Sequence, residues 1–340
     1  MDDKLEDVIK QYDFTVKARY RARGGTLLDT TEGLVLLKSL EGSKKHLQIE
    51  KAVTSHLFAQ GYEYTDRILA NKNGELCSKD CYSTDYVLRR WYRGEECNLR
   101  DLASVKTAAG NLALLHKKMS GIQVENEDMD AQADKKPKKG NYDLKDVYIR
   151  HNREMKRVRS YIKGKNHKNE FEVCILENYD DFYSQADESM SLLESSGYEE
   201  LAKRAKKQCI YVHNNYNYHN ILLLEQGVAT THFDQTCIGI QIRDLYDLMR
   251  KTMEKNHWNS SFGMELLESY HKERNLSREE NMLLYVQLLY PEKYWKILNY
   301  YYNNKKSWMS SRNMQKLLDI QAQGQEKKQF LARLKKHCIA

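Results

Sequence analysis

The sequence has little of what membrane-spanning and exported chains need. No uninterrupted apolar run approaches the ~20 residues that cross a bilayer. Residues 1–7 carry neither a basic region nor an apolar stretch, so we expect no secretory signal and no membrane insertion. With only two prolines and 41% hydrophobic residues in a chain of 340, there is enough material for a proper core, and we expect two lobes.

Cysteine is also too sparse and scattered to form a disulfide framework. The seven cysteines are an odd number in a long chain, which is typical of reduced thiols in a cytosol. Only Cys77 and Cys81 lie close together, and no second Cys/His pair follows at zinc-finger spacing. We therefore expect a hairpin loop with two free thiols at this point.

A strong excess of one charge is missing too. The 55 basic and 48 acidic residues leave a net charge of +7 and a pI of about 8.8. Lysine-rich segments at 135–139, 203–207 and 327–336 could attract an anionic polymer. Acidic residues are dense and no nucleic-acid motif is present, so we interpret these segments as solvated helix faces and a flexible loop, and expect no nucleic-acid partner.

Residues 14 to about 90 have the pattern of a small antiparallel sheet interrupted by one helix. An apolar helical stripe over 47–60 stops at Gly61, and Asn73-Gly74 is the strongest turn signal. The expected strands are 26–33 with its turn, 34–38, 67–70 and 85–89.

Residues 101–119 have helical spacing, and from Tyr142 onward nearly everything outside one motif region has it too. The expected helices are 101–119 with His116 as a helix-end histidine, 151–162, 171–193 and 201–212. Residues 121–140 change from acidic to lysine-rich with few apolar side chains, which predicts a mobile surface loop and not a domain boundary. The sequence thus predicts an α+β protein with a sheet-based part over 1–93 and a mainly helical part over 94–340.

The motif region consists of two short segments. Residues 213–220 read His-Asn-Asn-Tyr-Asn-Tyr-His-Asn, and residues 231–234 read Thr-His-Phe-Asp. Their spacing resembles small-molecule kinases of the aminoglycoside and choline phosphotransferase type. In those kinases the loop is His-Gly-Asp-x-x-x-x-Asn, and the next strand carries a hydrophobic-Asp-aromatic triplet. The resemblance implies a bilobed, protein-kinase-like fold, with ATP and magnesium or manganese as candidate cofactors.

Two carboxylates of that pattern are missing. Asn215 stands at the position of the aspartate that accepts or orients the substrate hydroxyl proton, and His232 stands at the position of the magnesium-binding aspartate. An amide oxygen accepts a hydrogen bond but takes no proton at neutral pH, and a general base contributes ~10²–10⁴-fold. Imidazole suits zinc, copper or iron better than magnesium. Asn220, the second metal ligand of the pattern, is retained.

Asp234 is the candidate replacement ligand for magnesium or manganese. The alternation of side chains along a strand would place it on the same face as His232. The alternative is that Asp234 pairs with a nearby arginine or lysine. The resemblance also implies that His213 braces the loop and that Asp244 supports it from below. As an alternative, Asp244 only caps the following helix, a contribution of ~1 kcal/mol.

The kinase resemblance also assigns roles in the sheet-based part. Lys38 corresponds to the strand lysine that binds nucleotide phosphates, and Glu50, in the following helix, corresponds to its ion-pair partner. Gly24 and Gly25 precede the first strand pair, where a nucleotide-covering loop is expected, although they lack the full glycine-rich pattern. A lysine is also common at the edge of a sheet, where it opposes aggregation, so the assignment of Lys38 depends on the later motif.

Longer segments narrow the resemblance to the CotS-type spore-coat proteins of endospore-forming Firmicutes. The similar segments are 23–25, 33–38, 142–172, 213–220, 244–258 and 290–308. This implies assembly in the mother-cell cytoplasm, a final place in the spore coat and other coat proteins as partners. Given Asn215 and His232, we expect a catalytically impaired pseudokinase of coat assembly or structure. The alternative is an active ATP-dependent phosphotransferase that acts on a small molecule or a coat component.

Two further interpretations stay open. His213, His219 and His232 with Cys237 could bind a transition metal, although their spacing matches no established ligand pattern. A group of C-terminal tyrosines could provide adhesive or cross-linking surface in a coat, or could pack helices, which the interleaved apolar residues favour. These tyrosines are Tyr285, Tyr290, Tyr294, Tyr300, Tyr301 and Tyr302.

Overall fold

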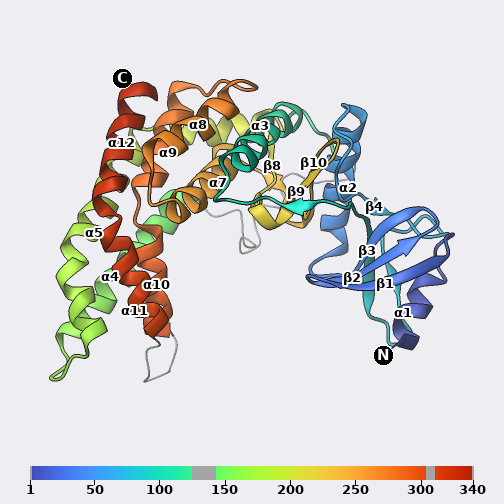
Figure 1. Cartoon of the computed structure of the whole chain (residues 1–340), viewed down its shortest axis with the longest axis horizontal. Coiled ribbons are helices and arrows are strands. Elements are labelled where there is room, and N and C mark those ends of the chain that lie inside the picture. The colour runs from blue at the N-terminus through green and yellow to red at the C-terminus, as the bar shows by residue number, and fades with distance from the viewer. Residues whose placement is uncertain (1, 125–142, 304–310, 339–340) are drawn as a thin grey trace.

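A computed structural model of the chain describes residues 2–124, 143–303 and 311–338. A strand-rich N-terminal part lies at one end of the molecule, and the helical C-terminal part extends away from it (Figure 1). Helix α3 (Leu102–Lys118) and the hairpin of β9 (Ile221–Leu224) and β10 (Gly227–Thr230) lie between the two. This arrangement agrees with the predicted α+β architecture.

The N-terminal sheet is antiparallel. Its strands are β1 (Val16–Ala22), β2 (Gly25–Thr30), β3 (Gly33–Ser39), β4 (Ile68–Leu69), β5 (Ser78–Lys79) and β6 (Asp85–Arg90). Within the described residues they run in the order β1-β2-β3-β6-β4, with β5 also paired to β6. Val35 to Leu37 of β3 are buried because this strand lies in the middle of the sheet.

Two helices accompany the sheet, whereas the sequence predicted one. Helix α1 (Asp2–Ile9) buries Val8 and Ile9 in a small core with Leu28 and Leu88 of the sheet. Helix α2 (Lys44–Ala59) is the predicted one, and the side chain of its N-cap Ser43 accepts a hydrogen bond from the His46 amide. Helix α1 is only eight residues long, at the short end of the range for helices, so its apolar residues Leu5, Val8 and Ile9 span little more than one turn.

The C-terminal part is built almost entirely from helices. After β7 (Glu95–Glu96) and α3, its elements are α4 (Leu144–Lys163), α5 (Glu170–Glu194), α6 (Tyr198–Lys207), β8 (Tyr211–Val212), β9, β10, β11 (Cys237–Ile238), α7 (Ile242–Lys255), α8 (Ser260–His271), α9 (Arg278–Leu289), α10 (Glu292–Asn303), α11 (Ser311–Ala322) and α12 (Gly324–Cys338). None of the helices in the described ranges is long and apolar enough to span a bilayer.

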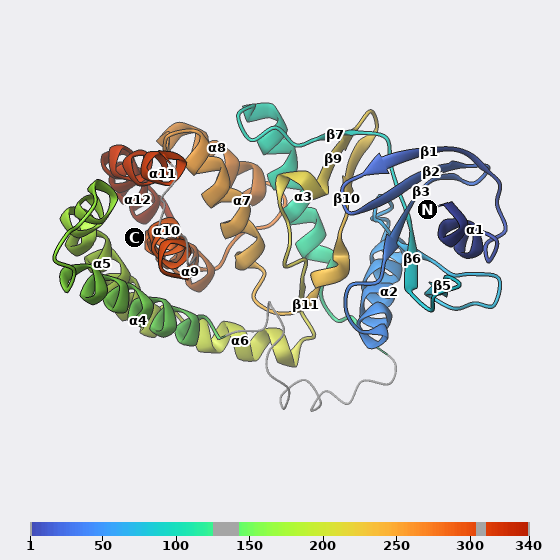
Figure 2. The ribbon, with the colours of Figure 1, turned by 90° about the horizontal axis from the view of Figure 1, so that it is seen from below.

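Helix α9 is the central element of the C-terminal part. It packs against α5, α7 and α12, and Figure 2 shows it surrounded by other helices. This location explains why Leu283, Leu284, Val286 and Leu288 are all buried although they point to different sides of the helix. Of the C-terminal tyrosines, Tyr285, Tyr290 and Tyr294 are buried in this core, Tyr301 packs against it, and Tyr300 and Tyr302 are exposed.

The end of one predicted helix differs from the prediction. The helix expected over 201–212 ends at Lys207, and its last two residues form β8, which pairs with β11. Gln208 and Cys209 leave the helix there, and Cys209 adopts φ +46°, which ends the helical path. Most of the predicted loop 121–140 lies outside the described residues.

A buried polar network joins the N-terminal and C-terminal parts. The hydroxyl of Tyr62, just after α2, hydrogen-bonds Asn111 of α3 (3.0 Å) and Thr230 of β10 (2.7 Å). The Asn111 amide then donates to the hydroxyl of Tyr216 (3.0 Å). One apolar cluster also contains Val53 of α2 together with residues of α3. One apolar core continues from the N-terminal part into the C-terminal part. The predicted division after residue 93 therefore stays a prediction.

Removing the Tyr62 hydroxyl should weaken this junction. In Tyr62→Phe, Asn111 and Thr230 lose a buried partner, which we expect to lower the free energy of unfolding by about 1–3 kcal/mol. Tyr20→Phe is the matched control because Tyr20 is 51% exposed, and we expect a change within ~0.5 kcal/mol. Chemical denaturation of both variants measures this. Equal stabilities would show that the network does not couple the two parts.

Candidate functional site

The two motif segments lie side by side. The Thr231 amide donates to the Asn220 carbonyl (2.9 Å), and Nε2 of His213 lies 3.1 Å from the Thr231 carbonyl. The β9–β10 hairpin makes this possible because it pairs Thr230 with Ile221 and so returns the chain to the end of the loop. His213 is fully buried, and its Nδ1 accepts a hydrogen bond from the Asn215 amide (3.3 Å). His213 therefore links the loop to residue 231 from the inside, as its predicted bracing role requires.

Asp244, in the first turn of α7, lies directly beneath the loop. Its buried carboxylate accepts hydrogen bonds from the backbone amides of His213 and Asn214, both at 2.8 Å. It also lies 3.2 Å from Nε2 of His116. Burial alone would raise the pKa of Asp244, but the hydrogen bonds from His116 and the loop keep it below its ordinary value. Asp244 therefore does more than cap its own helix.

His116 is a site residue whose role the sequence did not reveal. It was predicted as a helix-end histidine, but it is buried between α7 and α8. Its Nδ1 lies 2.7 Å from the Tyr270 hydroxyl while Nε2 faces Asp244. Burial lowers its pKa despite the carboxylate beside it. A neutral imidazole thus fixes the orientation of the carboxylate that holds the loop.

Asn215 is engaged in holding the loop together. Its side-chain oxygen accepts a hydrogen bond from the Asn217 amide group (2.9 Å), and its backbone carbonyl accepts one from the Asn220 side chain (2.9 Å). These amides keep the loop compact where the kinase pattern has an aspartate. The loop geometry is thus retained, but the group at position 215 has no carboxylate to take a proton.

His232 is neutral in this site. It adopts φ +67°, and its backbone amide donates to the carboxylate of Asp66 (2.7 Å). Its ring meets the indole of Trp91 edge-on at 5.8 Å. Burial lowers the pKa of His232 to about 4, so the imidazole carries no charge at neutral pH. An uncharged ring therefore stands where the resemblance places a metal-binding carboxylate.

The prediction that Asp234 and His232 share one face of a strand is wrong. Strand β10 ends at Thr230, and Phe233–Gln235 form a 3₁₀ turn after the left-handed His232. The Asp234 carboxylate instead lies 3.5 Å from the ammonium of Lys38, which is the alternative considered for this residue. Its other oxygen, Oδ1, is buried and has no hydrogen-bond partner among the described residues.

The predicted ion pair between Lys38 and Glu50 is also wrong. Glu50 is fully buried and pairs through both oxygens with Arg89 of β6, one contact being 3.0 Å. The carboxylates that pair with Lys38 within the described chain are Glu41 (3.6 Å) and Asp234. The register pairs Lys38 with Val87 and Leu36 with Arg89, so Lys38 and Arg89 project from the same face of the sheet. The planar guanidinium of Arg89 can bind both oxygens of a carboxylate at once, and it is Arg89 that pairs with Glu50.

Asp66 is a second residue that the sequence did not reveal. It follows α2, is fully buried, and lies 3.8 Å from Arg89 as well as beside the His232 amide. Burial raises its pKa, and the negative charge of Asp234 adds to this effect. The irregular segment between α2 and β4 carries no motif, so only the folded chain shows that Asp66 reaches the site.

The two glycines form the tip of the β1–β2 hairpin. Gly24 adopts φ +75°, and a Cβ atom at Gly25 would lie 2.4 Å from the Leu37 carbonyl, so a side chain cannot fit there. A Cβ atom at Gly24 would lie 3.8 Å from Cε of Lys38. The hairpin tip therefore lies close to Lys38, and its role in covering a nucleotide stays a prediction.

No transition-metal centre is formed by the described residues. They contain no group of three or more His, Cys, Asp or Glu side chains arranged to bind a metal ion. His219 instead pairs with Glu96 (2.5 Å), and Cys237 lies in β11. The open interpretation of His213, His219, His232 and Cys237 as a transition-metal site therefore has no support in this part of the chain. Cys77 and Cys81 are both free thiols.

Comparison with known proteins identifies a family and a fold. A family model described as "Spore coat putative kinase YutH" matches residues 5–334. No curated protein matches the sequence. Among solved structures, an aminoglycoside phosphotransferase from Alicyclobacillus acidocaldarius superposes with a TM-score of 0.85 at 18% identity, covering 98% of this chain and 96% of that chain.

Two more distant structures have the same fold. Spectinomycin phosphotransferase APH(9)-Ia, in complex with ADP and spectinomycin, has a TM-score of 0.58 at 12% identity, covering 96% of this chain and 95% of its own. Amicoumacin kinase hAmiN, in complex with AMP-PNP and Ca²⁺, has a TM-score of 0.52 at 12% identity, covering 96% and 92%. The predicted kinase-like fold and the predicted spore-coat resemblance are both confirmed.

Glu50→Gln tests the observed ion pair. Removing one partner of a buried pair leaves Arg89 without its counter-ion, so we expect a loss of about 3–5 kcal/mol in the free energy of unfolding. Glu194→Gln is the control, because Glu194 and its partner Lys145 are largely exposed, and the expected cost is below ~1 kcal/mol. Chemical denaturation compares them. If Lys38→Met were as costly as Glu50→Gln, the pairing described above would be incorrect.

The depressed pKa of His232 predicts a pH dependence of stability. Below about pH 6.5 an unfolded histidine binds a proton, whereas folded His232 stays neutral until about pH 4. The unfolded state binds more protons in this window, so stability is lost as the pH falls through it. We expect His232→Asn to reduce the slope of unfolding free energy against pH between 6.5 and 4. His167→Gln, at an exposed position, should leave the slope unchanged.

Proposed function

Because this chain belongs to the spore-coat kinase family YutH, we propose that it serves the spore coat as a kinase-like protein whose phosphotransfer chemistry is impaired. In this proposal it contributes a folded module to coat assembly or structure and makes its contacts with other coat proteins. It would be synthesised in the mother-cell cytoplasm and deposited in the coat. The distant structural neighbours share its fold and do not by themselves indicate its substrate.

The observation that carries the proposal is a complete loop with incomplete chemistry. The carboxylate of Asp244 and the ring of His213 hold residues 213–220 through buried hydrogen bonds. Position 215 offers an amide in place of a general base, which by itself costs ~10²–10⁴-fold in rate. Position 232 offers a neutral imidazole in place of a carboxylate. The support of the site is therefore present without the two groups that would activate the nucleophile and hold the metal.

The remaining donors suit a nucleotide and its metal only in part. In this proposal Lys38 would meet phosphate oxygens, and the unpartnered Oδ1 of Asp234 with the side chain of Asn220 would hold a hard cation. A divalent metal bound there would neutralise charge on the transferred phosphoryl group. Lys38 and Asp234 already pair with each other, so metal binding has to compete with this contact. Replacement of a carboxylate by neutral His232 further weakens the attraction for the cation.

An active phosphotransferase is the second candidate function. The specific observation in its favour is the buried, unpartnered oxygen of Asp234, which lies beside Lys38 and could take over as the metal ligand. Phosphoryl transfer depends mainly on positioning and charge stabilisation, so the lack of a strong base need not abolish it. The substrate would then be a small molecule or a coat component.

A double substitution separates the two functions. We expect the wild type to show at most weak thermal stabilisation by ATP with magnesium or manganese, and no phosphate transfer. Asn215→Asp with His232→Asp restores both carboxylates, and we expect it to gain metal-dependent ATP turnover. Binding at about 100 times the dissociation constant stabilises a protein by about 2.7 kcal/mol. Thermal unfolding and phosphate release measure these effects.

Controls identify the source of any activity. Adding Lys38→Met to the double variant should abolish the gained turnover. Wild-type turnover that is lost in Asp234→Asn would favour the active phosphotransferase and contradict the impaired one. A double variant that binds ATP with metal yet stays inactive would show that the missing carboxylates are not what limits the chemistry.

A further inference from the structure

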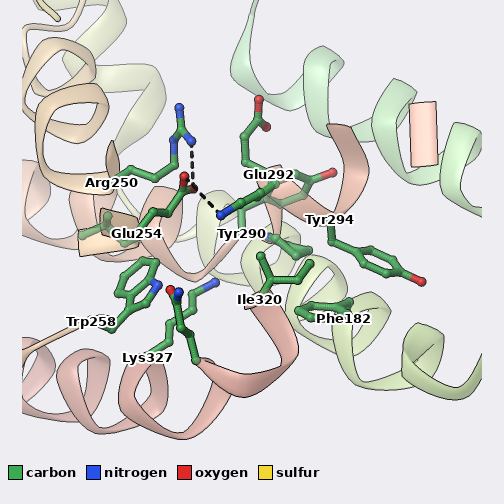
Figure 3. A pocket seen from close by; sticks show the side chains of 13 residues that line it. Phe182, Arg250, Glu254, Trp258, Tyr290, Glu292, Tyr294, Ile320 and Lys327 are labelled. Atoms are coloured by element: carbon green, nitrogen blue, oxygen red, sulfur yellow. Dashed lines mark hydrogen bonds and ion pairs between the residues drawn. The ribbon is translucent and has the colours of Figure 1, made fainter. Parts of the chain in front are cut away.

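A hollow in the helical part lies away from the kinase-like loop (Figure 3). It is formed where α7, α10, α11 and α12 meet, and it encloses about 40 Å³. One water molecule needs roughly 10–15 Å³ by this measure, so several non-hydrogen atoms fit. Arg250 and Glu254, which line it, follow Asp244 by six and ten residues on α7. At ~1.5 Å per residue they lie about 9 and 15 Å along the helix from the loop support.

The carboxylates of the hollow are already paired. Glu254 binds Arg250 through one oxygen (2.9 Å) and faces Lys293 with the other (3.9 Å), as the dashed lines in Figure 3 show. Glu292 pairs with Lys296 (3.1 Å). Arg250 is 8% exposed, and its Nε has no hydrogen-bond partner among the described residues. Arg250 also lies 3.7 Å from the carboxylate of Asp247, so two acids match its positive charge.

Lys327 lines the hollow and has fewer hydrogen-bond acceptors than its ammonium can bind. Its ammonium donates to the Leu289 carbonyl (3.0 Å) and to the side-chain oxygen of Gln185 (3.3 Å). Within the described part of the chain no carboxylate lies within 4.0 Å of it. An ammonium has three donors, so one is left over. The ammonium lies 5.4 Å from the centre of the Trp258 ring, and burial lowers the pKa of Lys327 to about 8.

The walls of the hollow are largely apolar and aromatic. Phe182 of α5 and Tyr294 of α10 stack at 4.3 Å, and Ile320 of α11 lies beside them, with Trp258 across from them (Figure 3). Such walls favour the hydrocarbon part of a ligand over a fully hydrated ion. The negative charges of Glu254 and Glu292 disfavour an anion that carries two charges.

We propose that this hollow binds a small organic monocarboxylate, with the Lys327 ammonium as its counter-ion and the aromatic and aliphatic walls around its hydrocarbon part. A lysine that only stabilises the end of α9 would account for the bond to Leu289, but not for the remaining donor or for the adjoining space. The site is separate from the kinase-like cleft and does not depend on nucleotide binding or turnover.

Titration of the full chain with sodium propionate tests the site. Thermal unfolding is followed at neutral pH, with sodium chloride at the same sodium concentration as the reference. We expect propionate to raise the unfolding temperature of the wild type and to bind at least tenfold more weakly to Lys327→Met, which keeps the length of the side chain. Lys328→Met, at the next and exposed position of α12, is the matched control and should respond like the wild type.

A second variant keeps the test decisive if Lys327→Met is poorly folded. Ile320→Phe leaves Lys327 in place and fills part of the hollow, so it should also lose the response to propionate. An equal response to propionate in all variants, or no response of the wild type up to about 100 mM, would overturn the proposal.

Discussion

The buried carboxylate of Asp244 is the contact on which the site depends. The backbone amides of His213 and Asn214 point inward, away from water, and a buried amide without a partner is costly. Asp244 supplies both partners from the first turn of α7, while His116 fixes the carboxylate from α3. Three segments that are distant in sequence therefore meet at one side chain. The loop also contacts residue 231 through the ring of His213, and so it helps to position the 3₁₀ turn that follows residue 231.

A second set of charges holds the sheet against α2 without using Lys38. Arg89 and Glu50 form a buried pair, so the position of α2 does not depend on Lys38. Lys38 is left to pair with Asp234, across the junction between the two parts. Two cations on one face of the sheet therefore have different partners: Arg89 pairs with α2, and Lys38 pairs with the turn after β10. The Arg89–Glu50 pair can therefore hold the sheet and α2 together whichever residues occupy positions 215 and 232.

The predicted parts of the site come from short segments of sequence. The loop 213–220 and the segment 231–234 follow from local spacing, whereas the support by Asp244 follows from the resemblance to kinases. Contacts in the structure bring all three together. The partner of Glu50 was predicted wrongly because Lys38 and Arg89 share one face, and only the packed sheet decides between them. Asp66 and His116 act through contacts between distant segments, for which no local pattern exists.

The charges around the turn 232–234 come close to balance without a metal ion. Lys38 and Arg89 are positive, whereas Glu50, Asp66 and Asp234 are the nearby buried or partly buried acids. Burial and the negative charge of Asp234 raise the pKa of Asp66, so this carboxyl is easier to protonate than an exposed aspartate. A divalent cation at Asp234 would have to displace Lys38 from this carboxylate. At this site the ion pairs stabilise the protein in the absence of a metal, and the pair of Lys38 with Asp234 opposes metal binding.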